Sequence, residues 1–269
     1  MKITALAASL ILIVPCAAFA VDGPPLQGWS GSGEAGLAAS NGNTHAQNLN
    51  AKMSVKYNDS RWKNEVTAST LRNRSSVTTT VTDAGAVPPA QTTTTKYQTT
   101  ANRFESGASA GYKLDDHSYV VGAARYEHDD FAPYSEQSIG SLGYGYQVLK
   151  NPRSELAVEV GGGYKAVNAS DAAPAPNATH VGADSLNGAA ARGKFEYKYS
   201  FNATTSFADT YLVESTSGNT FVQNDAGLQV KMTRTLGLKA AYEVRRNSDV
   251  LPGFRSTDQL LTTNLVYSF

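Results

Sequence analysis

Apolar and polar residues alternate at every second position over long segments of this chain. Between Asn48 and Tyr57, apolar or aromatic residues take the odd positions, while asparagine, lysine and serine take the even ones. The same alternation returns over 155–165, 189–199 and 236–245. Because successive side chains of a strand point to opposite faces, this pattern predicts β-strands with one apolar and one polar face.

The segments with this pattern predict an all-β fold of about twelve strands. Their expected spans are 28–40, 44–57, 61–74, 99–114, 117–128, 135–149, 155–165, 185–201, 204–214, 220–232, 235–246 and 258–269. The polar faces carry charges of both signs, and the apolar faces often end in tyrosine or phenylalanine. Both features are typical of a closed antiparallel transmembrane β-barrel with a polar lumen and aromatic girdles. A secreted soluble β-sandwich used in adhesion is the alternative fold.

The connections between the expected strands fall into two groups. The second, fourth, sixth, eighth and tenth are short: 58–60, 115–116, 150–154, 202–203 and 233–234. The others are longer, except Asn41-Gly42-Asn43. Short periplasmic turns and longer extracellular loops are the outer-membrane pattern. The threonine-rich segment 75–95 and the Ala-Pro-rich segment 172–179 are predicted to be flexible, solvated extracellular loops.

The two ends of the chain predict export and assembly. Residues 1–20 have the form of a cleavable signal peptide, with Lys2 before an apolar stretch and a small-x-small site ending at Ala20. The barrel domain is then 21–269, in the cell outer membrane, among outer-membrane lipids. Cys16 raises a lipoprotein alternative, but Pro15 fits a lipidation site poorly. Leu265, Tyr267 and Phe269 form a barrel-assembly signal, which predicts the barrel-assembly machinery as a partner of the last strand.

The charge balance and the motifs of the sequence predict no enzymatic chemistry. The 23 basic residues balance the 23 acidic ones, so nothing favours nucleic acid as a partner. Gly31, Gly33 and Gly36 have the spacing of a nucleotide-binding loop, but no strand precedes them and no helix follows. No cofactor or metal site is expected. The alternative is an outer-membrane protease or lipase at the extracellular rim, with His128-Asp129-Asp130 as its candidate groups.

The remaining constellation is a set of charged residues on the polar faces, which we expect to point into the lumen. They either pair and plug the interior or line a narrow aqueous channel. They are Lys52, Lys56, Lys63, Glu65, Arg103, Glu105, Arg125, Glu127, Glu159, Lys165, Arg192, Lys194, Glu196, Lys198, Lys239, Glu243 and Arg245.

Several glycine- and tyrosine-rich motifs, in this order, resemble one family. They are residues 29–36 (WSGSGEAG), 40–44 (SNGNT), 140–146 (GSLGYGY), 161–164 (GGGY) and 265–269 (LVYSF). The chain resembles the salt-induced outer-membrane proteins, which are proteobacterial outer-membrane β-barrels of unknown function. The resemblance implies a non-enzymatic barrel, either a narrow channel or an envelope component linked to salt or osmotic stress. It carries over no catalytic residues.

Overall fold

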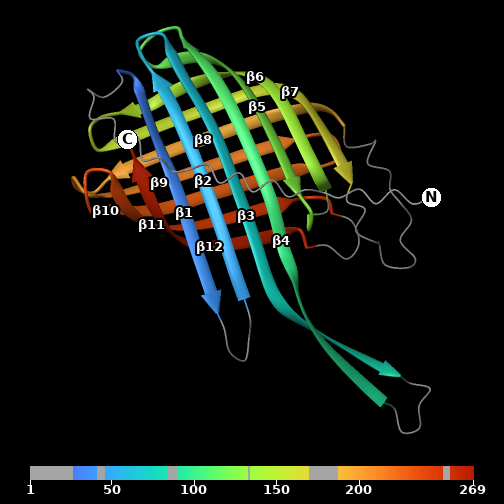
Figure 1. The fold of residues 1–269 in the computed structure, drawn as a ribbon. Helices are drawn as coiled ribbons and strands as arrows, with labels where there is room; N and C mark the ends of the chain where they lie inside the picture. The colour runs from blue at the N-terminus through green and yellow to red at the C-terminus, as the bar shows by residue number, and fades with distance from the viewer. Residues whose placement is uncertain (1–26, 41–45, 84–89, 133, 170–186, 251–254) are drawn as a thin grey trace, which may run out of the picture.

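Twelve antiparallel strands form one closed barrel in the computed structural model (Figure 1). The structure describes residues 27–40, 46–83, 90–132, 134–169, 187–250 and 255–269. The predicted fold class is confirmed, whereas the expected signal peptide and the Ala-Pro-rich segment lie outside the described residues. The strands are β1 Trp29–Ser40, β2 Ala46–Asn58, β3 Trp62–Asp83, β4 Ala90–Lys113, β5 Ser118–Asp129, β6 Tyr134–Lys150, β7 Ser154–Ala169, β8 Gly188–Ser200, β9 Thr205–Ser215, β10 Thr220–Lys231, β11 Leu236–Asn247 and β12 Thr257–Ser268.

Five short turns gather at one end of the barrel, which we call the turn end: 59–61, 114–117, 151–153, 201–204 and 232–235. Each begins with a side-chain oxygen that accepts hydrogen bonds from backbone N–H groups two and three residues later. Asp59 Oδ1, for example, accepts from Arg61 and Trp62 at 2.7 and 2.6 Å. Aspartate, asparagine and threonine favour such turns because their side chains replace a backbone acceptor.

Because the ionised carboxylate of Asp59 accepts these hydrogen bonds, the stability of this turn depends on pH. The backbone N–H of Trp62 is the main cause that holds the pKa of Asp59 below its ordinary value. The stability that this carboxylate contributes is therefore present above the pKa of an unfolded aspartate. It is lost as the pH falls through the lower folded pKa.

The opposite end, which we call the loop end, departs from the prediction at the threonine-rich segment. Most of that segment is not a loop, because β3 continues to Asp83 and β4 begins at Ala90, so that a two-stranded hairpin extends beyond the barrel (Figure 1). Thr78 and Thr80 hydrogen-bond across it to Thr95 and Thr93, at 2.8 and 3.2 Å. Threonine is β-branched, and cross-strand threonine pairs stabilise sheets, so the composition supports strands.

Shortening this hairpin is expected to leave the barrel intact. Beyond Ser75, β3 pairs only with β4, so the hairpin contributes nothing to the barrel wall. Replacing residues 79–94 by Asn-Gly, a favoured two-residue hairpin turn, should change the free energy of unfolding by less than about 0.5 kcal/mol. Urea unfolding in lipid vesicles measures this, and a loss of several kcal/mol would show that the hairpin supports the barrel.

The outside of the barrel is apolar. Large hydrophobic side chains are exposed on all sides, among them Leu49, Met53, Val66, Leu142, Val160, Leu228, Leu238 and Leu261. Aromatic pairs lie towards the turn end, with ring centroids 5.0 Å apart for Trp29 and Tyr57 and 5.3 Å apart for Trp62 and Tyr112. In the part of the chain that the structure describes, no helix is long and apolar enough to cross a membrane.

Candidate functional site in the barrel lumen

Ion pairs cross the lumen between strands that are not neighbours in the sheet. Two side chains on such strands can meet only through the interior of a closed barrel. The pairs that do so are Lys52–Asp225, Lys63–Glu196, Lys194–Glu65, Arg103–Glu243, Arg125–Glu214, Lys165–Glu214, Arg245–Glu105, Arg245–Glu127 and Lys239–Glu34. The predicted inward-facing charges therefore do pair with one another inside the barrel.

The most deeply buried of these groups lie towards the loop end and surround Glu214 of β9. Arg125 Nη2 and Nε donate to the two oxygens of Glu214, at 2.5 and 2.9 Å. Lys165 Nζ lies 3.2 Å from Glu214 Oε2. Arg125 also pairs with Glu127 at 2.6 Å, and Arg245 donates to the same Glu127 oxygen. Two carboxylates thus hold three cations from β5, β7 and β11.

An aromatic ring lies among these three cations. Phe221, near the start of β10, has no exposed surface. Its ring centroid is 4.7 Å from Arg125 Cζ, 5.1 Å from Lys165 Nζ and 5.1 Å from Arg245 Cζ. A cation within about 6 Å of a ring face is attracted to it, more strongly where water is absent. We call Arg125, Glu127, Lys165, Glu214, Phe221 and Arg245 the lumen cluster.

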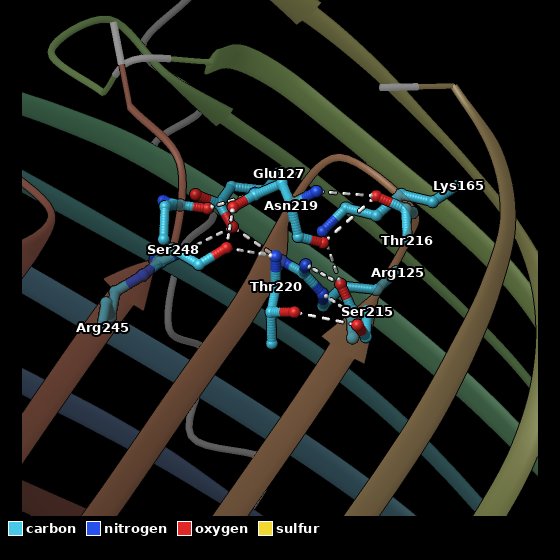
Figure 2. Close-up of polar contacts among 11 residues, drawn as sticks. Arg125, Glu127, Lys165, Ser215, Thr216, Asn219, Thr220, Arg245 and Ser248 are labelled. Atoms are coloured by element: carbon cyan, nitrogen blue, oxygen red, sulfur yellow. Dashed lines mark hydrogen bonds and ion pairs between the residues drawn. The ribbon is translucent and has the colours of Figure 1, made fainter. Parts of the chain in front are cut away.

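At the loop end, a hydrogen-bonded connection lies beside the lumen cluster (Figure 2). Asn219, in the connection between β9 and β10, is only 5% exposed. It donates to Asn247 Oδ1 at 2.9 Å and accepts from Ser248 Oγ at 3.2 Å. Ser248 Oγ in turn accepts from the backbone N–H of Thr220 at 2.8 Å. Hydrogen bonds therefore join the connections after β9 and β11 to each other at the loop end, next to the cluster.

The turn end is hollow. A cavity of about 260 Å³ opens there, with a lining that includes Lys56, Lys63, Glu65, Tyr119, Glu159, Lys194 and Glu196. Tyr119 is 3% exposed, and its hydroxyl donates to Glu159 at 3.0 Å and accepts from Lys63 at 3.2 Å. A Cβ on Gly145 would lie 2.1 Å from the Tyr119 ring, so glycine is required there for the ring to fit. The lumen thus narrows from a polar vestibule to the lumen cluster.

Four members of the ion pairs and the lumen cluster were not among the predicted groups: Glu34, Glu214, Phe221 and Asp225. On β10, Phe221 and Asp225 occupy odd positions and the outward-facing Val222 and Leu228 occupy even ones. The alternation at every second position therefore indicated that Phe221 and Asp225 face the lumen. Phe221 was not in the predicted inward set because that set contains charged residues only. Glu34 lies in a strand of small residues, where the alternation is weak.

Of the alternative enzymatic groups, the structure brings His128 and Asp130 together, whereas Asp129 bonds elsewhere. His128 Nε2 lies 2.9 Å from Asp130 Oδ1, and His128 Nδ1 lies 3.8 Å from Glu136 Oε1. The carboxylate of Asp129 instead accepts from the backbone N–H of Phe131 at 2.9 Å. His128 is 40% exposed and does not line the cavity. Within the described residues, no group of three or more His, Cys, Asp or Glu side chains could hold a metal ion.

The assembly residues lie along the seam where β12 meets β1. Leu265, Tyr267 and Phe269 all point outwards. Phe269 and Gly31 exchange two backbone hydrogen bonds, each of 3.0 Å. A Cβ on Gly31 would lie 2.3 Å from the Phe269 ring, so the glycine leaves the space that the terminal ring occupies. This packing accounts for Gly31 without a nucleotide.

The fold and this interior define a closed antiparallel barrel whose lumen is filled by paired charges. The chain belongs to a family described as protein of unknown function, DUF481, which matches residues 33–269. The uncharacterized protein YdiY of Escherichia coli (strain K12) is 25% identical over 246 residues, which are 89% of this chain and 83% of that protein. The recognition of a family of uncharacterised function from the sequence is thus confirmed.

Solved structures with a similar fold include two porins and a channel. The NanC porin is 14% identical with a TM-score of 0.42, over 89% of this chain and 97% of that one. The KdgM porin is 12% identical with a TM-score of 0.41, over 90% of this chain and 99% of that one. An outer membrane channel from Pseudomonas putida F1 is 13% identical with a TM-score of 0.44, over 92% and 97%.

Proposed function

We propose that this protein spans the bacterial outer membrane. The support comes from its apolar exterior and from the aromatic residues near the turn end. A strand of 12 residues, such as β1, is about 40 Å long, and a tilt of about 40° reduces its rise to about 30 Å. That rise matches a hydrocarbon core of about 30 Å.

Within the membrane, we propose a non-enzymatic role as a narrow channel that the lumen cluster closes at rest. The observation that carries this proposal is the complete burial of Glu214 and Phe221 in the interior of a barrel. Below them lies a polar vestibule, and its charges resemble those that line ion pathways. The implied link to salt or osmotic stress stays a prediction from the resemblance.

Replacing Phe221 by alanine is expected to open the lumen. The substitution removes the ring that fills the space among Arg125, Lys165 and Arg245, and water and ions can enter that space. In planar bilayers, folded wild-type protein should be silent or show rare current steps. The Phe221→Ala variant should show reproducible steps that scale with salt concentration.

Phe104→Ala provides the matched control, because Phe104 is 45% exposed on the outside of β4. It should behave as the wild type does. Steady large currents from the wild type, or equal currents from the two variants, would contradict closure by the lumen cluster.

We also propose that the barrel-assembly machinery recognises Leu265, Tyr267 and Phe269. This proposal is supported by the location of the three side chains on the outer face of β12 and by the position of Phe269 at the seam. Recognition by the machinery precedes closure, and the Phe269 ring then packs against Gly31.

The packing of Phe269 can be disturbed without changing the C-terminal sequence. Gly31→Val should displace the Phe269 ring, since even a Cβ at this position would lie 2.3 Å from it. The fraction of folded barrel in the outer membrane, seen as heat-dependent migration on gels, should fall severalfold. Gly33→Val is the control, because a Cβ at Gly33 meets nothing within 4 Å. Equal effects of the two variants would show that the Phe269 contact is unimportant.

A further inference from the structure

The seam between β1 and β12 is paired along only part of its length. It contains five residue pairs, from Gly31 with Phe269 to Ala35 with Leu265. By comparison, β1 forms twelve pairs with β2, and β12 forms eleven pairs with β11. Within the described residues 36–40 and 257–264, no further pair joins the two strands. Figure 1 shows the two strands together near the C-terminus and diverging from there.

The alternation of hydrogen bonding identifies the backbone groups that the open seam exposes. Gly31 and Phe269 form a hydrogen-bonded pair, and in an antiparallel ladder every second residue repeats this orientation. Along the same register, Leu37 on β1 and Leu261 and Thr263 on β12 turn their N–H and C=O groups towards the seam. The opposite edges of both strands are already paired.

These unpaired groups lie beside two highly exposed leucines. Leu37 is 79% exposed and Leu261 is 74% exposed. In the hydrocarbon core, an unpaired backbone N–H or C=O costs several kcal/mol, and open sheet edges facing lipid do not occur there. The open half of the seam therefore requires a partner that supplies both donors and acceptors.

A buried amide inside the seam is also without a partner. Asn264 is 4% exposed, and its Oδ1 has no hydrogen-bond partner among the described residues. A Cβ on Gly36 would lie 2.3 Å from that oxygen, so Asn264 Oδ1 lies where the pairing between the two strands stops.

We propose that the open half of the seam, residues 36–40 and 257–264, binds an extended polypeptide segment of a partner as an additional β-strand. A strand offers alternating N–H and C=O groups at the spacing that both edges need, which a lipid does not. Its apolar side chains would lie beside Leu37 and Leu261. Its polar side chains would point to the lumen. This inference rests on the proposed membrane location, but not on closure of the lumen.

Cysteine pairs test first whether the seam is open. Ser32 and Ser268 are paired across the seam, and the same register, if continued, would pair Ala38 with Thr262. Both positions are of the non-hydrogen-bonded type, at which Cα atoms are about 4.5 Å apart, within the range that a disulfide spans. In vesicles, S32C/S268C should form a disulfide on mild oxidation, and A38C/T262C should not. Formation in A38C/T262C would show that the seam closes, and would overturn the proposal.

A peptide then tests for docking. The probe has the sequence of residues 257–269 with cysteine in place of Thr262, because this strand already pairs with β1. It should form a disulfide with A38C barrels in vesicles. A peptide with cysteine in place of Ser268 should not react with S32C barrels, whose partner strand is already present. If the first peptide fails to react while lipid copurifies at the open seam, lipid is the occupant and strand docking is wrong.

Neither result depends on conductance. Failure of Phe221→Ala to conduct would leave both cysteine experiments unaffected. A barrel that dissolves without detergent and does not insert into vesicles would instead remove the membrane location on which both proposals rest.

Discussion

Replacing Glu214 by glutamine will lower the free energy of unfolding by about 3–5 kcal/mol, because it removes one charge from a buried network. Glu214 has no exposed surface and binds Arg125 through two hydrogen bonds and Lys165 through one. The amide keeps the shape of the carboxylate but leaves two buried cations without their main counter-ion. Urea unfolding in lipid vesicles, followed by the fluorescence of Trp29 and Trp62, provides the measurement.

Glu155→Gln is the matched control for this effect. Glu155 pairs with Lys198 at 3.5 Å, but both side chains are more than half exposed. Exposed pairs contribute about 0–1 kcal/mol, so this variant should unfold close to the wild type. A similar small loss in Glu214→Gln would mean that water reaches the lumen cluster and that the interior is not closed.

Leucine-to-arginine substitutions on the outer face will have effects that depend on depth. Leu142 lies at the middle of β6 and is 72% exposed. In a membrane, an arginine at the bilayer midplane costs about 2–4 kcal/mol, whereas one near the interface costs about 0–1 kcal/mol. Leu142→Arg should therefore destabilise the barrel by the larger amount.

Leu114→Arg is the comparison variant for the interface, because Leu114 is 57% exposed in a turn at the end of the barrel. Unfolding from lipid vesicles should separate the two variants by about 2 kcal/mol or more. Equal and small effects would indicate that water, and not lipid, surrounds the middle of β6.

The alternation of apolar and polar residues at every second position was sufficient to predict the strands, because each strand has one apolar face and one polar face. The number and order of strands followed from it. The threonine-rich hairpin was assigned wrongly because its biased composition was given more weight than the β-propensity of threonine. Its cross-strand threonine pairs become visible only when β3 and β4 are aligned.

The charged interior was predictable as a set of inward residues but not as a network. Arg125 and Glu214 are 89 positions apart, and they meet only because the barrel closes. Which cation meets which carboxylate depends on the stagger of all twelve strands around the barrel, and one sequence does not specify this stagger. The incomplete pairing of β1 with β12 could not be predicted for the same reason, because the register of this last pair depends on the stagger of all the other strands.

The threonine-rich hairpin also determines what this protein presents to its surroundings. From Ser76 to Asp83, eight residues of β3 extend past Ala46, the first residue of β2, a reach of about 26 Å. In an outer membrane with the loop end outwards, that length rises into the sugar layer of the cell surface. The hairpin is then the part that antibodies or phages meet first, and an epitope inserted near its tip would label intact cells.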